Sequence, residues 1–126
     1  MVLGVVSCSA FTRGEDWLSV ADSSWDLVVV GRIDFNLVSQ SAHSPNLRYT
    51  RVLAGRVPSG ARGQLAIRGV DARLLPEGGV PIYQSQREEI CFLKKVVVPG
   101  HEDADVYRVV DVKEATPQNL AAFRGH

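Results

Sequence analysis

The side chains that could bind a metal ion are concentrated in one short stretch, 101–105, with the sequence HEDAD. It contains His101, Glu102, Asp103 and Asp105. Carboxylate oxygens in a turn are ligands that calcium prefers, but the stretch has neither the length nor the glycine placement of a calcium loop. Because it follows a Pro-Gly pair, the sequence predicts an exposed acidic loop at 99–105, with no metal site and no cofactor.

Nucleophilic catalysis would need a cysteine or serine beside a base, and the available bases are His43, His101 and His126. Cys91 lies between apolar neighbours, which is typical of a buried thiol rather than a nucleophile. No G-x-S-x-G motif is present. Cys8 and Cys91 are expected to stay unpaired, because a chain of this length needs no disulfide staple. We therefore expect no enzyme, and a hydrolase is the weaker alternative.

The glycine-rich stretch 55–63, GRVPSGARG, invites comparison with a phosphate-binding loop. Such a loop is followed by Lys and then Ser or Thr, and it opens a helix. Neither feature follows Gly63, so the stretch is predicted to be a hairpin turn.

Aromatic and basic residues on predicted strands could form a face for single-stranded nucleic acid. OB-type barrels bind single strands by stacking bases on aromatic rings above a basic groove. The residues that would form this face are Tyr49, Arg51, Arg68 and Tyr107. The chain has 14 basic and 14 acidic residues and 7% aromatic residues, whereas nucleic-acid binders normally carry a basic excess. Nucleic acid is therefore the alternative partner and not the expected one.

These residues belong to a chain of 126 residues, which is long enough for one domain with its own core. A composition of 45% hydrophobic and 22% charged residues is that of a soluble globular protein. No apolar run is long enough to cross a membrane. We expect a single domain over 1–126.

The first ten residues, MVLGVVSCSA, are apolar and end in small residues, like the end of a secretory signal. They have no basic region, and their apolar part is shorter than that of a signal peptide. They predict a first strand or a packed N-terminal arm, and the alternative is a chain that begins within a longer precursor. The sequence as given favours a cytoplasmic protein, whereas a trimmed signal peptide would place it outside the cytoplasm.

The strongest strand signal is the stretch 26–39, which begins DLVVVGRIDF. Residues 27–30 form an unbroken apolar run, which predicts a segment covered on both faces. Residues 33–37 alternate apolar and polar side chains, which predicts cover on one face. Gly31 separates the two halves, and a glycine within a strand marks a bulge or bend. We expect the strand to bend at Gly31 and to pair with a different neighbour in each half.

Four further strands are predicted between turns rich in glycine and proline: 47–55, 64–70, 87–98 and 106–112. Apolar spacing predicts one helix over 15–22, and Thr116 as N-cap with Gly125 as terminator predicts a second. The pattern predicts a mainly β fold, a five-stranded OB-like barrel with short helices at the N- and C-terminal ends. The expected core residues are Leu27, Val29, Ile33, Leu65, Ile67, Ile90 and Phe92.

The segments 26–33, 49–55 and 89–94, taken in order, resemble bacterial proteins with an OB-type barrel related to tissue inhibitors of metalloproteinases and netrin-like modules. The resemblance covers roughly three-quarters of the chain and implies a fold rather than an activity. Inhibitors of that kind bind the protease zinc through the amino group of an N-terminal cysteine in a Cys-x-Cys motif. Here Cys8 is followed by Ser9 and Ala10 and is preceded by other residues, so metalloprotease inhibition is not expected.

The connection 69–86 between the third and fourth predicted strands is more apolar than a free loop. Its apolar residues either plug the end of the barrel or form a patch for a partner, a second copy of the chain in a homodimer included. We therefore expect a non-enzymatic module that binds a protein or a small molecule at this connection. The candidate binding residues are Leu74, Leu75, Ile82 and Tyr83.

Overall fold

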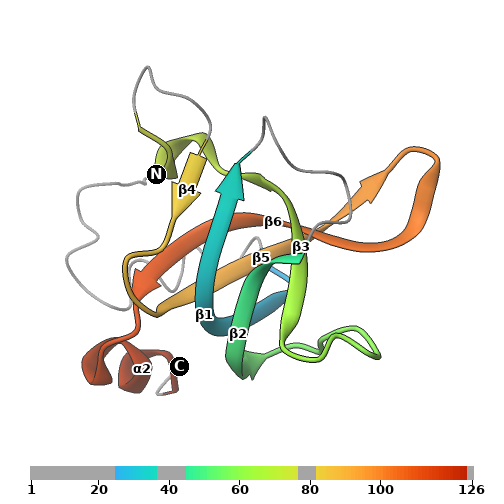
Figure 1. Cartoon of the computed structure of the whole chain (residues 1–126). Helices are drawn as coiled ribbons and strands as arrows, with labels where there is room; N and C mark the ends of the chain where they lie inside the picture. Colours follow the sequence, from blue (N-terminus) through green and yellow to red (C-terminus); the bar gives the residue numbers. More distant parts are fainter. Residues whose placement is uncertain (1–24, 37–44, 77–81, 125–126) are drawn as a thin grey trace, which may run out of the picture.

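A computed structural model describes residues 25–36, 45–76 and 82–124 of the chain. The described chain is mainly β, with one α-helix near the C-terminus (Figure 1). The helix predicted over 15–22 lies outside the described residues, as do Cys8, His43 and His126. Over the three described ranges, no helix has the length and apolar character needed to span a membrane.

Six strands follow one another along the described chain: β1 (Leu27–Asn36), β2 (Pro45–Ala54), β3 (Gln64–Val70), β4 (Ile82–Gln84), β5 (Glu89–Val98) and β6 (His101–Glu114). A 3-10 turn, η2 (Ala72–Leu74), follows β3, and the helix α2 (Pro117–Arg124) follows β6. The prediction of β3 is correct at both ends. The short β4 was not predicted, because three residues are too few to show alternation.

Five of these strands form a closed ring in the order β1, β2, β3, β6, β5, and the ring closes because β1 pairs with both β2 and β5 (Figure 1). Neighbouring strands are antiparallel except β3 and β6, which are parallel. The sixth strand, β4, pairs with β1 over 34–36. This arrangement leaves the far end of β1 between β2 on one side and β4 on the other.

Gly31 is the point at which β1 changes partners, as predicted. Up to Gly31 the strand pairs with β5, and from residue 34 onward it pairs with β4. The pairing with β2 shifts register between Val30 and Gly31, which is the mark of a bulge. A Cβ atom at Gly31 would lie 2.2 Å from the carbonyl oxygen of Arg48. Only glycine therefore permits this close approach of β2.

An inner cluster of apolar side chains fills the ring. Its buried members are Leu27, Val29, Ile33, Phe35, Leu47, Leu65, Ile67, Cys91, Leu93, Tyr107 and Val109. Because side chains alternate between the faces of a strand, each of the five ring strands contributes residues to this cluster. Five of the seven predicted core residues belong to it, and all seven are buried.

An outer cluster lies between the ring and α2. Its buried members are Val28, Val30, Ile90, Phe92 and Val110, and Leu120 and Phe123 of α2 pack against them. The rings of Trp25, Phe92 and Phe123 contact one another, with centroids 6.1 to 6.5 Å apart. The apolar run 27–30 is therefore covered on both faces, as predicted. The helix starts as predicted, since the Asn119 N–H donates to Thr116 Oγ1 at 3.1 Å; Gly125 lies outside the described residues.

The hairpin of β5 and β6 extends beyond the ring (Figure 1). The predicted loop at 99–105 is therefore wrong for 101–105, which belong to β6. The turn is confined to Pro99 and Gly100, and Gly100 has a φ of 84°. Charged residues fit this strand because side chains on both faces of the extension reach solvent, where Lys95 Nζ pairs with Asp105 Oδ1 at 2.9 Å.

Candidate functional site

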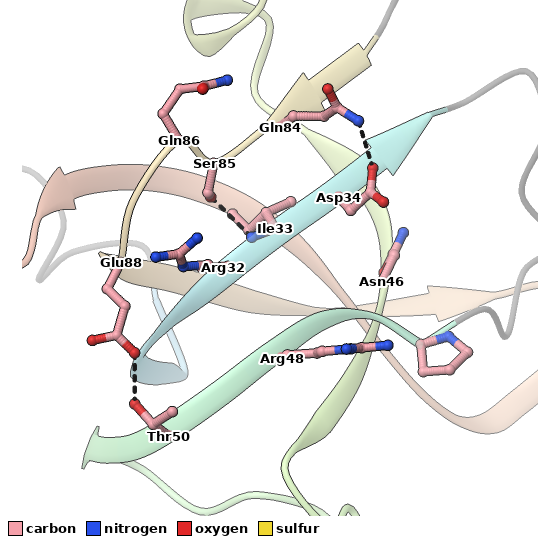
Figure 2. A pocket seen from close by; sticks show the side chains of 11 residues that line it. Arg32, Ile33, Asp34, Asn46, Arg48, Thr50, Gln84, Ser85, Gln86 and Glu88 are labelled. Atoms are coloured by element: carbon pink, nitrogen blue, oxygen red, sulfur yellow. Dashed lines mark hydrogen bonds between the residues drawn. The ribbon is translucent and has the colours of Figure 1, made fainter.

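A hollow of about 850 Å³ lies between β1, β2 and the connection from β4 to β5 (Figure 2). It is lined by Arg32, Ile33, Asp34, Pro45, Asn46, Arg48, Thr50, Gln84, Ser85, Gln86 and Glu88. Its volume falls within the range of about 300–1,000 Å³ that small-molecule sites occupy. The lining is mostly polar, so a ligand would be held there by hydrogen bonds and charge.

Two arginines form the floor of the hollow. Arg32 of β1 stands directly opposite Arg48 of β2 in the antiparallel register, and both side chains are exposed. The next pair along, Ile33 and Leu47, points into the inner cluster, so the arginines point to the outer face. Within the described part of the chain, neither guanidinium forms an ion pair or a hydrogen bond with another side chain.

A buried amide fixes the start of β2 at the edge of the hollow. Asn46 is 8% exposed, and its side chain bonds both backbone groups of Ile67 in β3. The Ile67 N–H donates to Asn46 Oδ1 at 2.6 Å, and Asn46 Nδ2 donates to the Ile67 carbonyl at 3.0 Å. These bonds replace a backbone pair where the β2–β3 register shifts, between Pro45 and Leu47. They therefore hold the start of β2, at the edge of the hollow, on β3.

The connection from β4 to β5 forms the wall of the hollow and is attached to β1 through Ser85. The Ser85 N–H donates to the Ile33 carbonyl at 2.8 Å, and the Ile33 N–H donates to Ser85 Oγ at 2.9 Å. Glu89 holds the same segment from β5, because it accepts from Ser85 Oγ at 2.6 Å and from the Tyr83 hydroxyl at 2.8 Å. Burial and the Glu89 carboxylate raise the pKa of Tyr83, so its phenol remains a donor.

Each of the two carboxylates of the hollow accepts a hydrogen bond from a neutral side chain. Asp34 Oδ1 accepts from Gln84 Nε2 at 3.2 Å, and Glu88 Oε2 accepts from Thr50 Oγ1 at 3.2 Å (Figure 2). No histidine or cysteine lies among the residues that line this hollow, and the Ser85 hydroxyl is engaged with Glu89. The arrangement can bind a polar ligand through hydrogen bonds and charge.

The sequence matches no protein-family model, and neither a curated protein nor a solved structure shows significant similarity to it.

The four residues predicted for binding fall into two pairs. Leu74 and Tyr83 pack against the inner cluster, where they help to cover one end of the ring. Leu75 and Ile82 are half-buried and are not members of that cluster. The predicted segment leads directly into the wall of the hollow, since Gln84 follows Tyr83. The binding role of the four residues stays a prediction.

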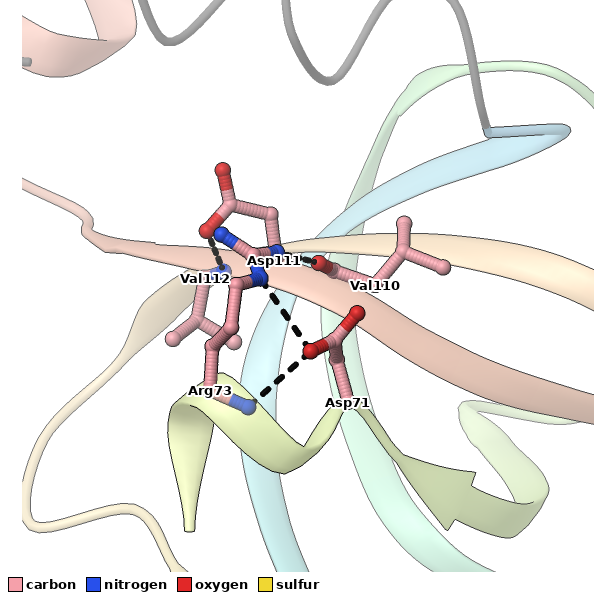
Figure 3. Close-up of polar contacts among 5 residues, drawn as sticks. All are labelled: Asp71, Arg73, Val110, Asp111 and Val112. Carbon is pink, nitrogen blue, oxygen red and sulfur yellow. Dashed lines mark hydrogen bonds and ion pairs between the residues drawn. The ribbon is translucent and has the colours of Figure 1, made fainter. Parts of the chain in front are cut away.

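Polar contacts hold η2, in the first part of the 69–86 connection, on β6 (Figure 3). The backbone N–H and Nε of Arg73 donate to Asp71 Oδ1 at 3.0 and 3.1 Å, and its Nη2 donates to the Val110 carbonyl at 2.6 Å. Next to them, Asp111 is 8% exposed. Burial raises the pKa of Asp111 above its ordinary value of 3.8, although Lys113 acts in the opposite direction. These bonds attach η2 to β6, so we assign the cluster a structural role.

Two of the residues predicted to form a nucleic-acid face, Tyr49 and Tyr107, are partly or fully buried. Tyr107 is 5% exposed within the inner cluster, and Tyr49 packs against that cluster. Arg51 and Arg68 are exposed on β2 and β3. Stacking of bases needs an accessible ring face, so the burial of Tyr107 argues against this alternative.

The described residues can also be compared with the requirements of a metal site and of a reactive thiol. Among the described residues, no group of three or more His, Cys, Asp and Glu side chains could hold a metal ion. Cys91 is free and fully buried, and burial raises the pKa of its thiol. It is a core residue, as predicted. The pairing of Cys8 lies outside the described residues.

A second hollow of about 390 Å³ lies near the other end of β1, lined by Asp26, Leu27, Arg56, Val57, Pro58, Lys95, Asp105 and Tyr107. Its lysine is already paired. Lys95 Nζ lies 2.9 Å from Asp105 Oδ1, and the Lys95 N–H donates to Asp26 Oδ2 at 2.9 Å. Because Asp26 and Asp105 already bond to Lys95, this hollow is the weaker candidate for a ligand.

Several residues of the larger hollow were not predicted as site residues, chiefly Arg32, Asn46 and Ser85. The sequence did indicate that Arg32 is exposed, because this charged residue lies next to apolar residues in a predicted strand. Arg32 lies opposite Arg48 because of the register between β1 and β2. The sequence pattern of one strand does not reveal that register.

Proposed function

We propose that this chain is a non-enzymatic binding module on an OB-like barrel, and that its ligand binds in the hollow between β1, β2 and the β4–β5 connection. The strand arrangement supports the OB-like part of the proposal. β1, β2 and β3 are consecutive and paired, and β5 returns to lie beside β1, which is the Greek-key order. A closed five-stranded Greek-key ring is the architecture of OB-type barrels.

The observation that carries the binding function is the fixed polar hollow. Its wall is held by Ser85 and Glu89, and its floor is held by Asn46, so the cavity is largely formed before any ligand arrives. Preformed concave sites with a few convergent polar groups are the usual places for small ligands. The proposal is a small molecule or a short peptide segment rather than a large flat partner.

A binding screen tests the proposal. The backbone amide signals of the isotope-labelled protein would be recorded with a panel of small metabolites and short peptides. We expect ligands to shift the amides of 32–34, 46–50 and 84–88 more than those elsewhere. Shifts that map to other surfaces, or a panel without a single ligand, would contradict the proposal.

A matched pair of variants sharpens the screen. Thr50→Trp places a large ring at the floor of the hollow, whereas Val52→Trp places it on an exposed part of the same strand, outside the hollow. We expect the first variant to lose the ligands found with the wild-type protein and the second to keep them. Equal binding by both variants would place the ligand elsewhere.

A further inference from the structure

We propose that the hollow recognises an anionic group, a carboxylate or a phosphate, and that Arg32 and Arg48 hold it. This inference rests on the proposed binding function and adds the chemical class of the ligand. Guanidinium groups bind carboxylates and phosphates through paired, charge-assisted hydrogen bonds.

Like charges directly opposite in a sheet are unfavourable. The described sheet has three such pairs: Arg32 with Arg48, Lys94 with Arg108, and Glu89 with Glu114. The second and third pairs each have partners of opposite charge or hydrogen-bond donors, whereas no described acidic side chain forms an ion pair with Arg32 or Arg48. An unfavourable pair that the fold leaves uncompensated is a place where a ligand of opposite charge is stabilising.

Compensation of the basic pair comes from two aspartates. Lys94 Nζ lies 4.0 Å from Asp26 Oδ2. Burial raises the pKa of Asp71, but Arg73, with a smaller contribution from the charge of Arg108, lowers it below its ordinary value. The basic residues of this pair therefore already have acidic neighbours.

Compensation of the acidic pair comes from an arginine and two hydroxyls. Arg87 forms an ion pair with Glu114, and Glu89 accepts hydrogen bonds from Tyr83 and Ser85. The two carboxylates are thus satisfied separately.

The arginine pair differs although carboxylates are close to it. Asp34 and Glu88 line the same hollow, but they accept hydrogen bonds from Gln84 and Thr50, respectively. Figure 2 shows Arg32 extending toward the Glu88 end of the hollow and Arg48 toward Asn46. This separation is what two repelling guanidinium groups on one floor would adopt, and exposed side chains reorient rapidly. An anion between them replaces the repulsion with two attractions.

The size of the hollow indicates the rest of the ligand. About 850 Å³ is much more space than one carboxylate or phosphate fills, so the anionic group belongs to a larger molecule. Gln84, Gln86 and Thr50 offer amide and hydroxyl groups to its remaining polar parts. We therefore expect a polar organic acid or phosphate ester, or a peptide with a free carboxylate.

Titration with inorganic phosphate and, separately, with acetate tests the inference at low ionic strength. The arginine Nε–Hε signals would report which side chains respond. We expect saturable shifts for Arg32 and Arg48 with at least one of the two anions. The anion that binds more tightly identifies the group as phosphate or carboxylate. Shifts that are equal at every exposed arginine would overturn the inference.

Two variants supply the matched control. Arg48→Gln removes one charge of the pair, and Arg51→Gln removes an exposed charge of the same strand outside the hollow. We expect Arg48→Gln to weaken anion binding by about tenfold or more and Arg51→Gln to change it by less than about twofold. Phosphate or acetate should also raise the Tm of the wild-type protein but not that of Arg48→Gln. Equal binding by the two variants would overturn the inference.

The two proposals fail separately. If neutral members of the ligand panel bind in the hollow while neither anion does, the anion inference fails and the binding function stands. If the anions bind at Arg32 and Arg48 while no organic ligand occupies the hollow, the inference stands and the proposed binding function fails.

Discussion

Replacing Gly31 with alanine tests the feature that brings the two strands of the hollow together. The added Cβ atom would lie 2.2 Å from the carbonyl oxygen of Arg48 and 2.8 Å from the Cα atom of Tyr49. Both neighbours are backbone atoms, so neither can rotate away, and β1 and β2 must separate. Overpacking of this kind costs about 1–3 kcal/mol, and a backbone obstruction places the cost near the upper end of that range.

Gly69 provides the matched control, because it is a second glycine within a strand of the same ring. A Cβ atom there would meet only the Arg108 side chain, at 3.6 Å, which is an ordinary contact. Gly69→Ala should therefore leave the free energy of unfolding unchanged or raise it by up to about 1 kcal/mol, because alanine reduces the entropy of the unfolded chain. The two variants should differ by at least about 2 kcal/mol.

Urea unfolding followed by tryptophan fluorescence measures this difference. With a slope of about 1–3 kcal/mol per molar urea, a difference of about 2 kcal/mol moves the midpoint by about 1 M. Gly31→Ala should also weaken binding in the hollow, because the displaced carbonyl belongs to Arg48. If Gly31→Ala and Gly69→Ala unfold at the same midpoint, the close approach of β1 and β2 at Gly31 is refuted.

Three further predictions concern buried groups. Asn46→Ala leaves the Ile67 N–H and carbonyl without their side-chain partner, so the free energy of unfolding should fall by about 1–3 kcal/mol in a urea titration; no change would contradict the role of this amide. Asp111 has a raised pKa, so the folded protein binds its proton more tightly and the free energy of unfolding should decline as the pH rises from 3.8 through the folded pKa. Asp111→Asn should remove the part of this pH-dependent decline that Asp111 causes. If the variant keeps the wild-type pH profile, the raised pKa of Asp111 is contradicted. In a Cys8→Ser background, Cys91 should react with a thiol reagent only after unfolding, and rapid reaction of the native protein would contradict its burial.

The fold could be predicted where the apolar pattern was compatible with only one kind of burial. The run 27–30 had to be covered on both faces, and the structure places the inner cluster on one face and α2 on the other. The stretch 101–105 was predicted incorrectly because charge and a preceding Pro-Gly pair favour a loop. A hairpin that extends beyond the ring can carry charged residues on both faces, so its strands lack the alternation of a half-buried sheet.

The candidate site was harder to predict, because it depends on which residues oppose each other across strands. Arg32 and Arg48 meet through a register that includes two shifts in the β1–β2 pairing, and a slip of one residue would send either side chain to the other face. The connection 69–86 was predicted to carry the site through its apolar residues Leu74, Leu75, Ile82 and Tyr83, and their binding role stays a prediction. The hollow is formed by the polar end of the same connection, where Ser85 bonds to Ile33.

A crystallographic soak with a fragment library tests the central claim most directly, because it shows where ligands bind without assuming their identity. The library should contain carboxylates, phosphate esters and neutral amides. We expect fragments to gather in the hollow between β1, β2 and the β4–β5 connection, with acidic fragments contacting Arg32 or Arg48. Fragments that gather instead in the smaller hollow beside Lys95 and Asp105, and leave the larger one empty, would contradict the claim.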